Sequence, residues 1–155
     1  MLTKARIAVF VSGGGTNLEA ILCAQERGEI PHGEIVLVCA SNASAYALTR
    51  AANHGVTGVA VPRKGSTQEA FESALSAHLK EHNIDFIILA GFLSILSEAF
   101  VKQWPDRIIN VHPSLIPSFC GEGFYGLRVH EAALERGVKL TGATVHFVNE
   151  IADGG

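Results

Sequence analysis

Short runs of apolar residues, each followed by a longer segment with helical spacing, are the feature that most limits the fold of this chain. The first run, 7–11, precedes the segment 17–27, where Leu18, Ile21 and Leu22 recur at helical spacing. Strands that are apolar throughout belong in a parallel sheet that is covered on both faces. The alternation of such strands with helices therefore predicts an α/β fold, a doubly wound, mostly parallel open sheet.

The same pattern gives approximate positions for the elements. We expect strands at 7–11, 34–40, 59–61, 86–90, 107–112 and 143–148. We expect helices at 17–27, 45–54, 68–81 and 129–136. Thr67 is a candidate cap for the third helix, and Phe71, Leu75 and Leu79 fall on one face of it. Because ligands of such sheets bind beyond the carboxyl ends of the strands, candidate chemistry is sought directly after each strand.

Composition and charge exclude several classes of protein. Hydrophobic residues make up 48% and charged residues 17%, which is a globular composition. At 155 residues we expect a single domain, 1–155. Twelve Lys and Arg against fifteen Asp and Glu give a formal charge of −3, and the longest basic feature is Arg63-Lys64. A nucleic-acid partner is therefore not expected.

The cysteines and the N-terminal segment indicate a reducing compartment. Cys23, Cys39 and Cys120 are widely spaced and form no CxxC pair, so neither a disulfide framework nor a zinc ribbon is predicted. They are interpreted as buried or incidental thiols. The apolar run 7–11 is shorter than a signal peptide or a membrane span requires. We therefore expect a soluble, cytoplasmic protein with no membrane partner.

A glycine loop, Ser12-Gly13-Gly14-Gly15-Thr16-Asn17, joins the first strand to the first helix. Glycines let the backbone approach a ligand closely, and a helix N-terminus offers N–H groups to an anion such as a phosphate. Leu18 breaks the dinucleotide fingerprint, and no Gly-Lys-Ser/Thr follows for a Walker A loop. The alternative is a tight turn in which Thr16 or Asn17 caps the helix.

A second motif, Asn110-Val111-His112-Pro113, ends the fifth strand. Alternation along the strand places Asn110 and His112 on one face. An amide donor beside an imidazole can stabilise an oxyanion and move a proton, although a lone histidine at a strand end is more often structural. Pro113 ends the ladder and fixes the turn.

The third motif is Asn149-Glu150-Ile151-Ala152-Asp153-Gly154-Gly155, after the last apolar strand. Asp-Gly-Gly is typical of a turn, which is one interpretation of Asp153. The other is a carboxylate that orients His112 and favours its protonated form. His146, on the preceding strand, is interpreted as structural. No ligand spacing supports a metal at His112, His146 and Asp153.

Four segments together resemble one enzyme family. They are 12–17, 89–97 (Leu-Ala-Gly-Phe-Leu-Ser-Ile-Leu-Ser), 110–117 (Asn-Val-His-Pro-Ser-Leu-Ile-Pro) and 142–155. In order and approximate spacing the chain resembles the glycinamide ribonucleotide formyltransferases of purine biosynthesis, which have a Rossmann-like formyltransferase fold. The resemblance implies transfer of a formyl group from 10-formyltetrahydrofolate, a co-substrate, to the amine of glycinamide ribonucleotide, by direct attack through a tetrahedral intermediate. No metal is implied.

The resemblance also implies roles for individual residues. The implied catalytic residues are Asn110, His112 and Asp153. The implied ribonucleotide-binding residues are Gly15, Thr16, Asn17 and Pro113. The implied folate-binding residues are Gln68, Leu93, Ser94, Ile95, Leu96, Asn110, Asn149, Glu150, Ile151, Ala152 and Asp153. Gln68 stands where family members place an arginine near the folate tail.

The resemblance leaves alternatives open. The family continues beyond Asp153 through a further strand and helices, so a chain ending at Gly155 is expected to be a truncated formyltransferase domain. Other enzymes that use formyltetrahydrofolate, a hydrolase and methionyl-tRNA formyltransferase, are the nearest alternatives. A non-catalytic nucleotide-binding module would explain the glycine loop but not His112 and Asp153. A homodimer is left open.

Overall fold

The computed structural model describes residues 3–155, which divide into two compact units. The first unit extends to Leu96 and the second runs from Ser97 to Gly155. Each unit is described by itself below. Within residues 3–155, no helix is long and apolar enough to cross a membrane.

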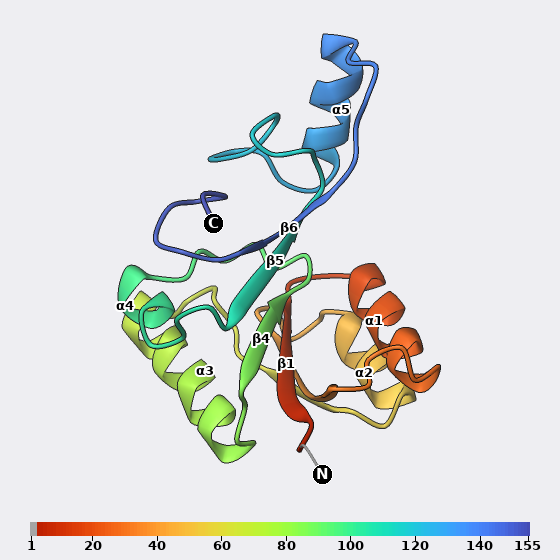
Figure 1. The fold of residues 1–155 in the computed structure, drawn as a ribbon. Coiled ribbons are helices and arrows are strands. Elements are labelled where there is room, and N and C mark those ends of the chain that lie inside the picture. Colours follow the sequence, from red (N-terminus) through yellow and green to blue (C-terminus); the bar gives the residue numbers. More distant parts are fainter. Residues whose placement is uncertain (1–2) are drawn as a thin grey trace. The chain divides into compact units, whose positions relative to one another are not determined.

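A parallel sheet forms the centre of the first unit (Figure 1). Within residues 3–96 its strands are β1 (Ala5–Val11), β2 (Gly33–Ala40), β3 (Thr57–Ala60) and β4 (Phe86–Leu89), in the spatial order β3-β2-β1-β4. β1 pairs in parallel with both β2 and β4. The strand order therefore reverses at β1, and the loops that follow β1 and β4 emerge at the switch point where open α/β sheets bind ligands.

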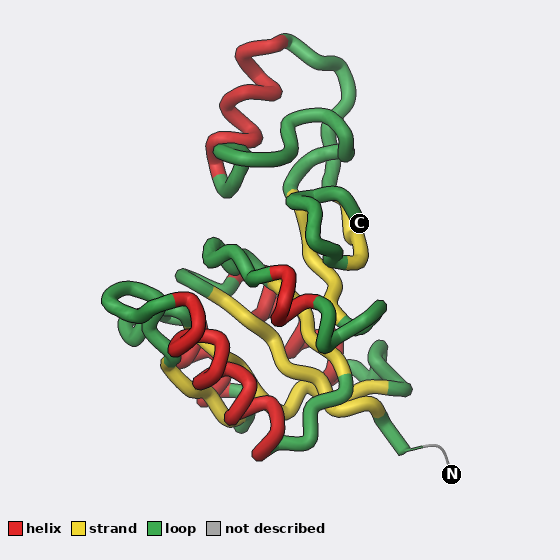
Figure 2. Tube along the Cα trace, turned by 90° about the vertical axis from the view of Figure 1, so that its left-hand side faces the viewer, coloured by secondary structure: helices red, strands yellow, loops and turns green. Residues whose placement is uncertain are grey.

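Helices cover both faces of this sheet (Figures 1 and 2). α1 (Thr16–Glu26) and α2 (Ala47–Asn53) pack in one apolar cluster with alternate β1 residues, including Val9 and Val11. On the other face, the ring of Phe92 is tilted against Phe10 of β1 and stacks on Phe71 of α3 (Gln68–Glu81). The two-sided covering explains why the strands are apolar throughout.

The second unit contains α4 (Glu98–Val101), β5 (Ile108–His112), α5 (Leu127–Arg136) and β6 (Thr144–Phe147). β5 and β6 pair antiparallel, with Asn110 opposite His146 and His112 opposite Thr144. The predicted α/β class with mostly parallel strands is confirmed, and β6 is the antiparallel member. The sequence analysis missed α4, a single turn capped by the Ser97 hydroxyl, which accepts from the N–H of Phe100.

In the turn between β1 and α1, the backbone of Gly15 lies close against Ala47 of α2. Gly15 is the N-cap of α1 and has φ +73°, in the left-handed region. A Cβ at this position would lie 2.7 Å from the Cβ and 3.0 Å from the Cα of Ala47, on α2. Only glycine satisfies both the backbone angle and the space.

Cys39, the last residue but one of β2, is fully buried. Burial raises the pKa of its thiol to about 12, because the thiolate would lose its hydration. The reactive thiolate is therefore absent near neutral pH, as expected for a structural cysteine.

Replacing Gly15 by Ala should destabilise the chain by more than the same change at Gly28. Gly28 has φ +76° but nothing within 4 Å of an added Cβ, so Gly28→Ala carries only the left-handed backbone cost, about 1–2 kcal/mol. Gly15→Ala adds the clash with Ala47, roughly 1–3 kcal/mol more. Urea unfolding followed by circular dichroism measures both variants. Equal losses would show that α2 moves aside without cost.

Iodoacetamide should label Cys120 in the native chain near neutral pH and leave Cys39 unlabelled. Cys120 is partly exposed, whereas the thiol of Cys39 is buried and protonated. Peptide mass spectrometry measures the labelling at each cysteine, with urea-unfolded protein as the control in which both should react. Native labelling of Cys39 at the rate of Cys120 would mean that β2 opens readily.

Candidate functional site

Asp153 lies at the centre of a polar cluster in the second unit. One carboxylate oxygen, Oδ2, lies 3.7 Å from Nδ1 of His112, and the other, Oδ1, lies 3.7 Å from Nε2 of His146. The backbone N–H of Gly121 donates to Oδ2 at 2.7 Å. The side chains of His112 and His146 are 5% and 6% exposed, so both contacts with Asp153 are largely shielded from solvent.

His112 directs both ring nitrogens at oxygen atoms. Nε2 donates to the carbonyl oxygen of Phe119 at 2.8 Å, while Nδ1 faces Asp153. The ring of His112 is therefore held between a backbone carbonyl and a carboxylate, on the strand that also carries Asn110.

Asn110 and His146 form the second half of the cluster. They are paired across β5 and β6, and Nδ2 of Asn110 lies 3.2 Å from Nε2 of His146. Because Nδ1 of His146 lies 2.9 Å from the carbonyl oxygen of Phe147 and donates to it, Nε2 carries the lone pair that accepts from Asn110. The sequence analysis interpreted His146 as structural, and the structure brings it to the cluster. The missing signal was the strand register, which places positions 110 and 146 opposite each other.

The loop after β5 is held by Thr144, opposite His112. The Thr144 hydroxyl donates to the carbonyl of Ser114 at 2.7 Å and accepts from the N–H of Ile116 at 3.0 Å. The Ser114 hydroxyl in turn donates to the carbonyl of Ser118 at 2.5 Å. These bonds position the chain that begins at Pro113 and ends at Phe119, the hydrogen-bond partner of His112.

The segment 149–153 forms a turn that carries Asp153 into the cluster. The N–H of Ile151 donates to the side-chain oxygen of Asn149 at 3.0 Å, and the N–H of Gly154 donates to the carbonyl of Ile151 at 3.0 Å. Asp153 itself has φ +53°. The turn is confirmed, and the same aspartate faces His112, so the two interpretations of Asp153 are not exclusive.

In the first unit, the glycine loop leaves the start of α1 without a side-chain cap. The expected alternative, with Thr16 or Asn17 as the cap, is wrong: the cap is Gly15, and the helix start has no side-chain cap hydrogen bond. Gly15 replaces a capping side chain because the left-handed turn and the approach of Ala47 leave no room for one. Arg50 donates to the carbonyl of Gly14 at 2.8 Å and fixes the loop from α2. A helix start without a side-chain cap keeps backbone N–H groups that can bind an anion.

The segment after β4, 91–96, also lies in the first unit and is held through its backbone. The N–H of Leu93 donates to the hydroxyl of Ser12 at 2.9 Å, and the side chain of Gln68 donates to the carbonyl of Ile95 at 3.0 Å. Leu93 and Ile95 are 62% and 81% exposed. The structure therefore brings Gln68 to the predicted folate segment, in which Leu93 and Ile95 are exposed to solvent. Arg63, which sequence reasoning missed, donates to Gln68 at 3.0 Å.

Comparisons with known proteins agree with this arrangement. A family model described as formyl transferase matches residues 5–155. The chain is 43% identical over 154 residues to a chicken protein, trifunctional purine biosynthetic protein adenosine-3, covering 98% of this chain and 15% of the chicken protein. It is 36% identical to the chloroplastic phosphoribosylglycinamide formyltransferase of Arabidopsis thaliana, covering 98% of this chain and 52% of that one.

A solved structure gives the same result. The crystal structure of glycinamide ribonucleotide transformylase 1 from Symbiobacterium toebii has a TM-score of 0.88 and 38% identity, covering 98% of this chain and 69% of that one. The α/β fold is thus shared with this solved glycinamide ribonucleotide transformylase. The chain belongs to the formyl transferase family, which confirms the resemblance.

Replacing Thr144 by Val should loosen the loop that ends at Phe119. The change removes the hydroxyl and leaves the N–H of Ile116 and the carbonyl of Ser114 without this partner, which costs about 1–3 kcal/mol. Thr144→Ser keeps the hydroxyl and is the matched control, with a smaller loss. Trp104 is the only tryptophan and lies in the second unit, so its fluorescence during urea unfolding reports this unit. Equal stability of the Val and Ser variants would contradict the role of the hydroxyl.

Proposed function

We propose that this chain transfers a formyl group from 10-formyltetrahydrofolate to the primary amine of glycinamide ribonucleotide. The chain spans 15% and 52% of the two curated relatives described above, so the activity of the whole protein is a proposal for this chain. The observation that carries it is the approach of Asp153 to His112 on the strand that also bears Asn110. The relatives whose names state this reaction support it.

Asn110, His112 and Asp153 have distinct roles in the proposed reaction. The amine attacks the formyl carbon, the C=O oxygen takes up negative charge, and the bond from carbon to N10 of the folate then breaks. The Asn110 amide and a protonated His112 stabilise that oxygen, and a proton passes from the amine to N10 through His112. Asp153 faces Nδ1 and orients the ring.

The Phe119 contact sets a condition on this mechanism. Nε2 of His112 is engaged by a backbone carbonyl, and Nδ1 faces Asp153. For Nε2 to reach a substrate atom, the carbonyl of Phe119 must move away. The loop 118–126 contains Gly121, Gly123 and Gly126, all at positive φ. Because glycine has no Cβ, the backbone of this loop can change conformation more easily than it could with other residues.

The substrate-binding roles follow the resemblance. Gly15, Thr16, Asn17 and Pro113 are proposed for the ribonucleotide, since α1 begins with N–H groups that suit a phosphate. The folate is proposed to contact Gln68 and the segments 93–96 and 149–153, where Leu93, Ile95 and Ile151 offer exposed apolar surface. We also still predict a single formyltransferase domain and a cytoplasmic location. Whether the chain forms a homodimer stays open.

Replacing His112 by Ala should lower the rate of formyl transfer by about 10²–10³, because a charge-stabilising donor is lost. The KM for glycinamide ribonucleotide should change little, since the proposed phosphate site lies on the glycine loop. His130→Ala is the matched control: this histidine lies exposed on α5 and should leave the rate unchanged. Steady-state assays with both substrates measure the rates. A His112→Ala rate equal to that of the His130→Ala control would remove His112 from the mechanism.

Separate titrations with each substrate distinguish the enzyme from a nucleotide-binding module. An enzyme should bind both glycinamide ribonucleotide and the folate, and calorimetry measures each in the absence of the other. Binding of the ribonucleotide alone, with no formyl transfer, would identify the chain as a module and overturn the proposal.

A further inference from the structure

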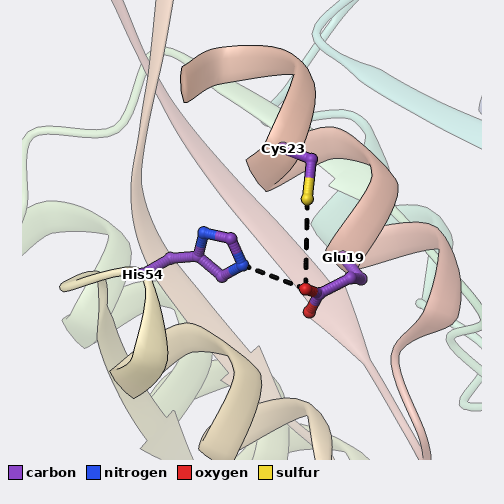
Figure 3. A group of neighbouring side chains, drawn as sticks. All are labelled: Glu19, Cys23 and His54. Atoms are coloured by element: carbon purple, nitrogen blue, oxygen red, sulfur yellow. Dashed lines mark hydrogen bonds and ion pairs between the residues drawn. The ribbon is translucent and has the colours of Figure 1, made fainter. Parts of the chain in front are cut away.

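A mixed cluster of ligand-type side chains lies in the first unit, between α1 and the end of α2 (Figure 3). Among residues 3–155, Glu19, Cys23 and His54 form one group whose ligand atoms all lie within 4.8 Å of one another. Glu19 and Cys23 are one helical turn apart on α1, and His54 is the C-cap of α2. The formyl-transfer proposal uses none of them.

We propose that Glu19, Cys23 and His54 form a zinc site, with water as the fourth ligand. Thiolate, imidazole and carboxylate are the three side-chain types that bind Zn²⁺ in proteins. Nε2 of His54 lies 3.1 Å from Oε1 of Glu19, and Sγ of Cys23 lies 4.0 Å from the same oxygen. A tetrahedral zinc ion holds such atoms about 3.3–3.6 Å apart, so shifts of a fraction of an ångström place all three around one ion.

Glu26 supplies the outer partner that zinc-binding histidines usually have. Nδ1 of His54 lies 2.6 Å from Oε1 of Glu26. A hydrogen bond from Nδ1–H to this carboxylate leaves the lone pair on Nε2, the nitrogen that faces Glu19 and Cys23. Glu26 thus orients the imidazole so that Nε2 points at the centre of the cluster. A chance contact between two helices would not need such an orienting partner.

The charges and the burial of the cluster suit a bound divalent cation. Arg50 donates to Oε2 of Glu19 at 3.1 Å, which leaves Oε1 for the metal. Zn²⁺ and Arg50 together balance the carboxylates of Glu19 and Glu26 and the thiolate of Cys23. The side chain of His54 is 13% exposed and that of Glu19 is 35% exposed, so the cluster is shielded yet reachable from solvent.

Metal binding requires two proton losses and no other reactant. Glu19 and Glu26 both bond to His54 and raise the pKa of its imidazole, so zinc must displace a proton from Nε2, and the Cys23 thiol must also lose its proton to solvent. The sequence analysis interpreted Cys23 as an incidental thiol, because His54 is remote in sequence and only the packing of α2 on α1 brings it near.

Titration of the full 155-residue chain, first freed of metal with a chelator, tests the site. Co²⁺ should give the intense visible bands of a tetrahedral site together with a near-ultraviolet thiolate-to-cobalt band, and Zn²⁺ should displace it. Cys23→Ser should remove the thiolate band, whereas Cys120→Ser, the matched cysteine control, should keep it. Absence of the band in the unmodified chain, or its loss in Cys120→Ser, would overturn the proposal.

Affinity for Zn²⁺, measured by competition with a chromophoric chelator, tests the outer partner. Glu26→Gln should weaken binding about 10–100-fold, as outer-shell changes do at zinc sites. Glu29→Gln is the matched control, since Glu29 pairs with Arg27 on the surface and not with His54. Zn²⁺ should also raise Tm of the unmodified chain and not of Cys23→Ser, while circular dichroism without metal shows that each variant is folded. Equal Zn²⁺ affinity in the unmodified chain, Cys23→Ser, Glu26→Gln and Glu29→Gln would mean that the cluster is an ion-pair network only.

Discussion

The sheet of the first unit is covered on both faces, and this burial determines where polar chemistry can occur. Val9 and Phe10 are neighbours on β1, and each is fully buried against a different layer of helices. A polar side chain inside these strands would lose its water without gaining a partner, at a cost of about 1–3 kcal/mol. Polar groups are therefore confined to the strand ends, where Ser12 joins the glycine loop to the segment after β4.

Those parts of the fold and of the candidate site that depend on local patterns could be predicted from the sequence. The helix at 68–81 was predicted with the bounds that the structure shows, and Thr67 caps it by accepting from the N–H of Ala70. Asn110 and His112 were expected on one face of a strand, and their contacts with His146 and Asp153 bear this out. A cap and a strand alternation each involve only a few neighbouring residues, so the sequence contains the whole signal.

What the sequence could not give depends on which distant segments meet. His146 enters the cluster through the register of β5 with β6, and Phe119 meets His112 through a turn at positive φ. Gly15 is the N-cap because α2 packs so closely against it that no side chain fits there, and this packing is not visible in the sequence. Arg50 connects two features that seem independent in the sequence, since one guanidinium binds both the Gly14 carbonyl and Glu19.

The contact between Gly15 and Ala47 means that two positions 32 residues apart share one small volume. A larger side chain at position 47 would press on the glycine loop from the α2 side, just as a side chain at position 15 would press on α2. Natural variation at the two positions should therefore be coupled: any relative with a bulkier residue at position 47 needs a displaced α2 or a differently shaped loop. The residue at position 47, on α2, would in this way restrict the shape of the glycine loop, which is proposed to bind the ribonucleotide.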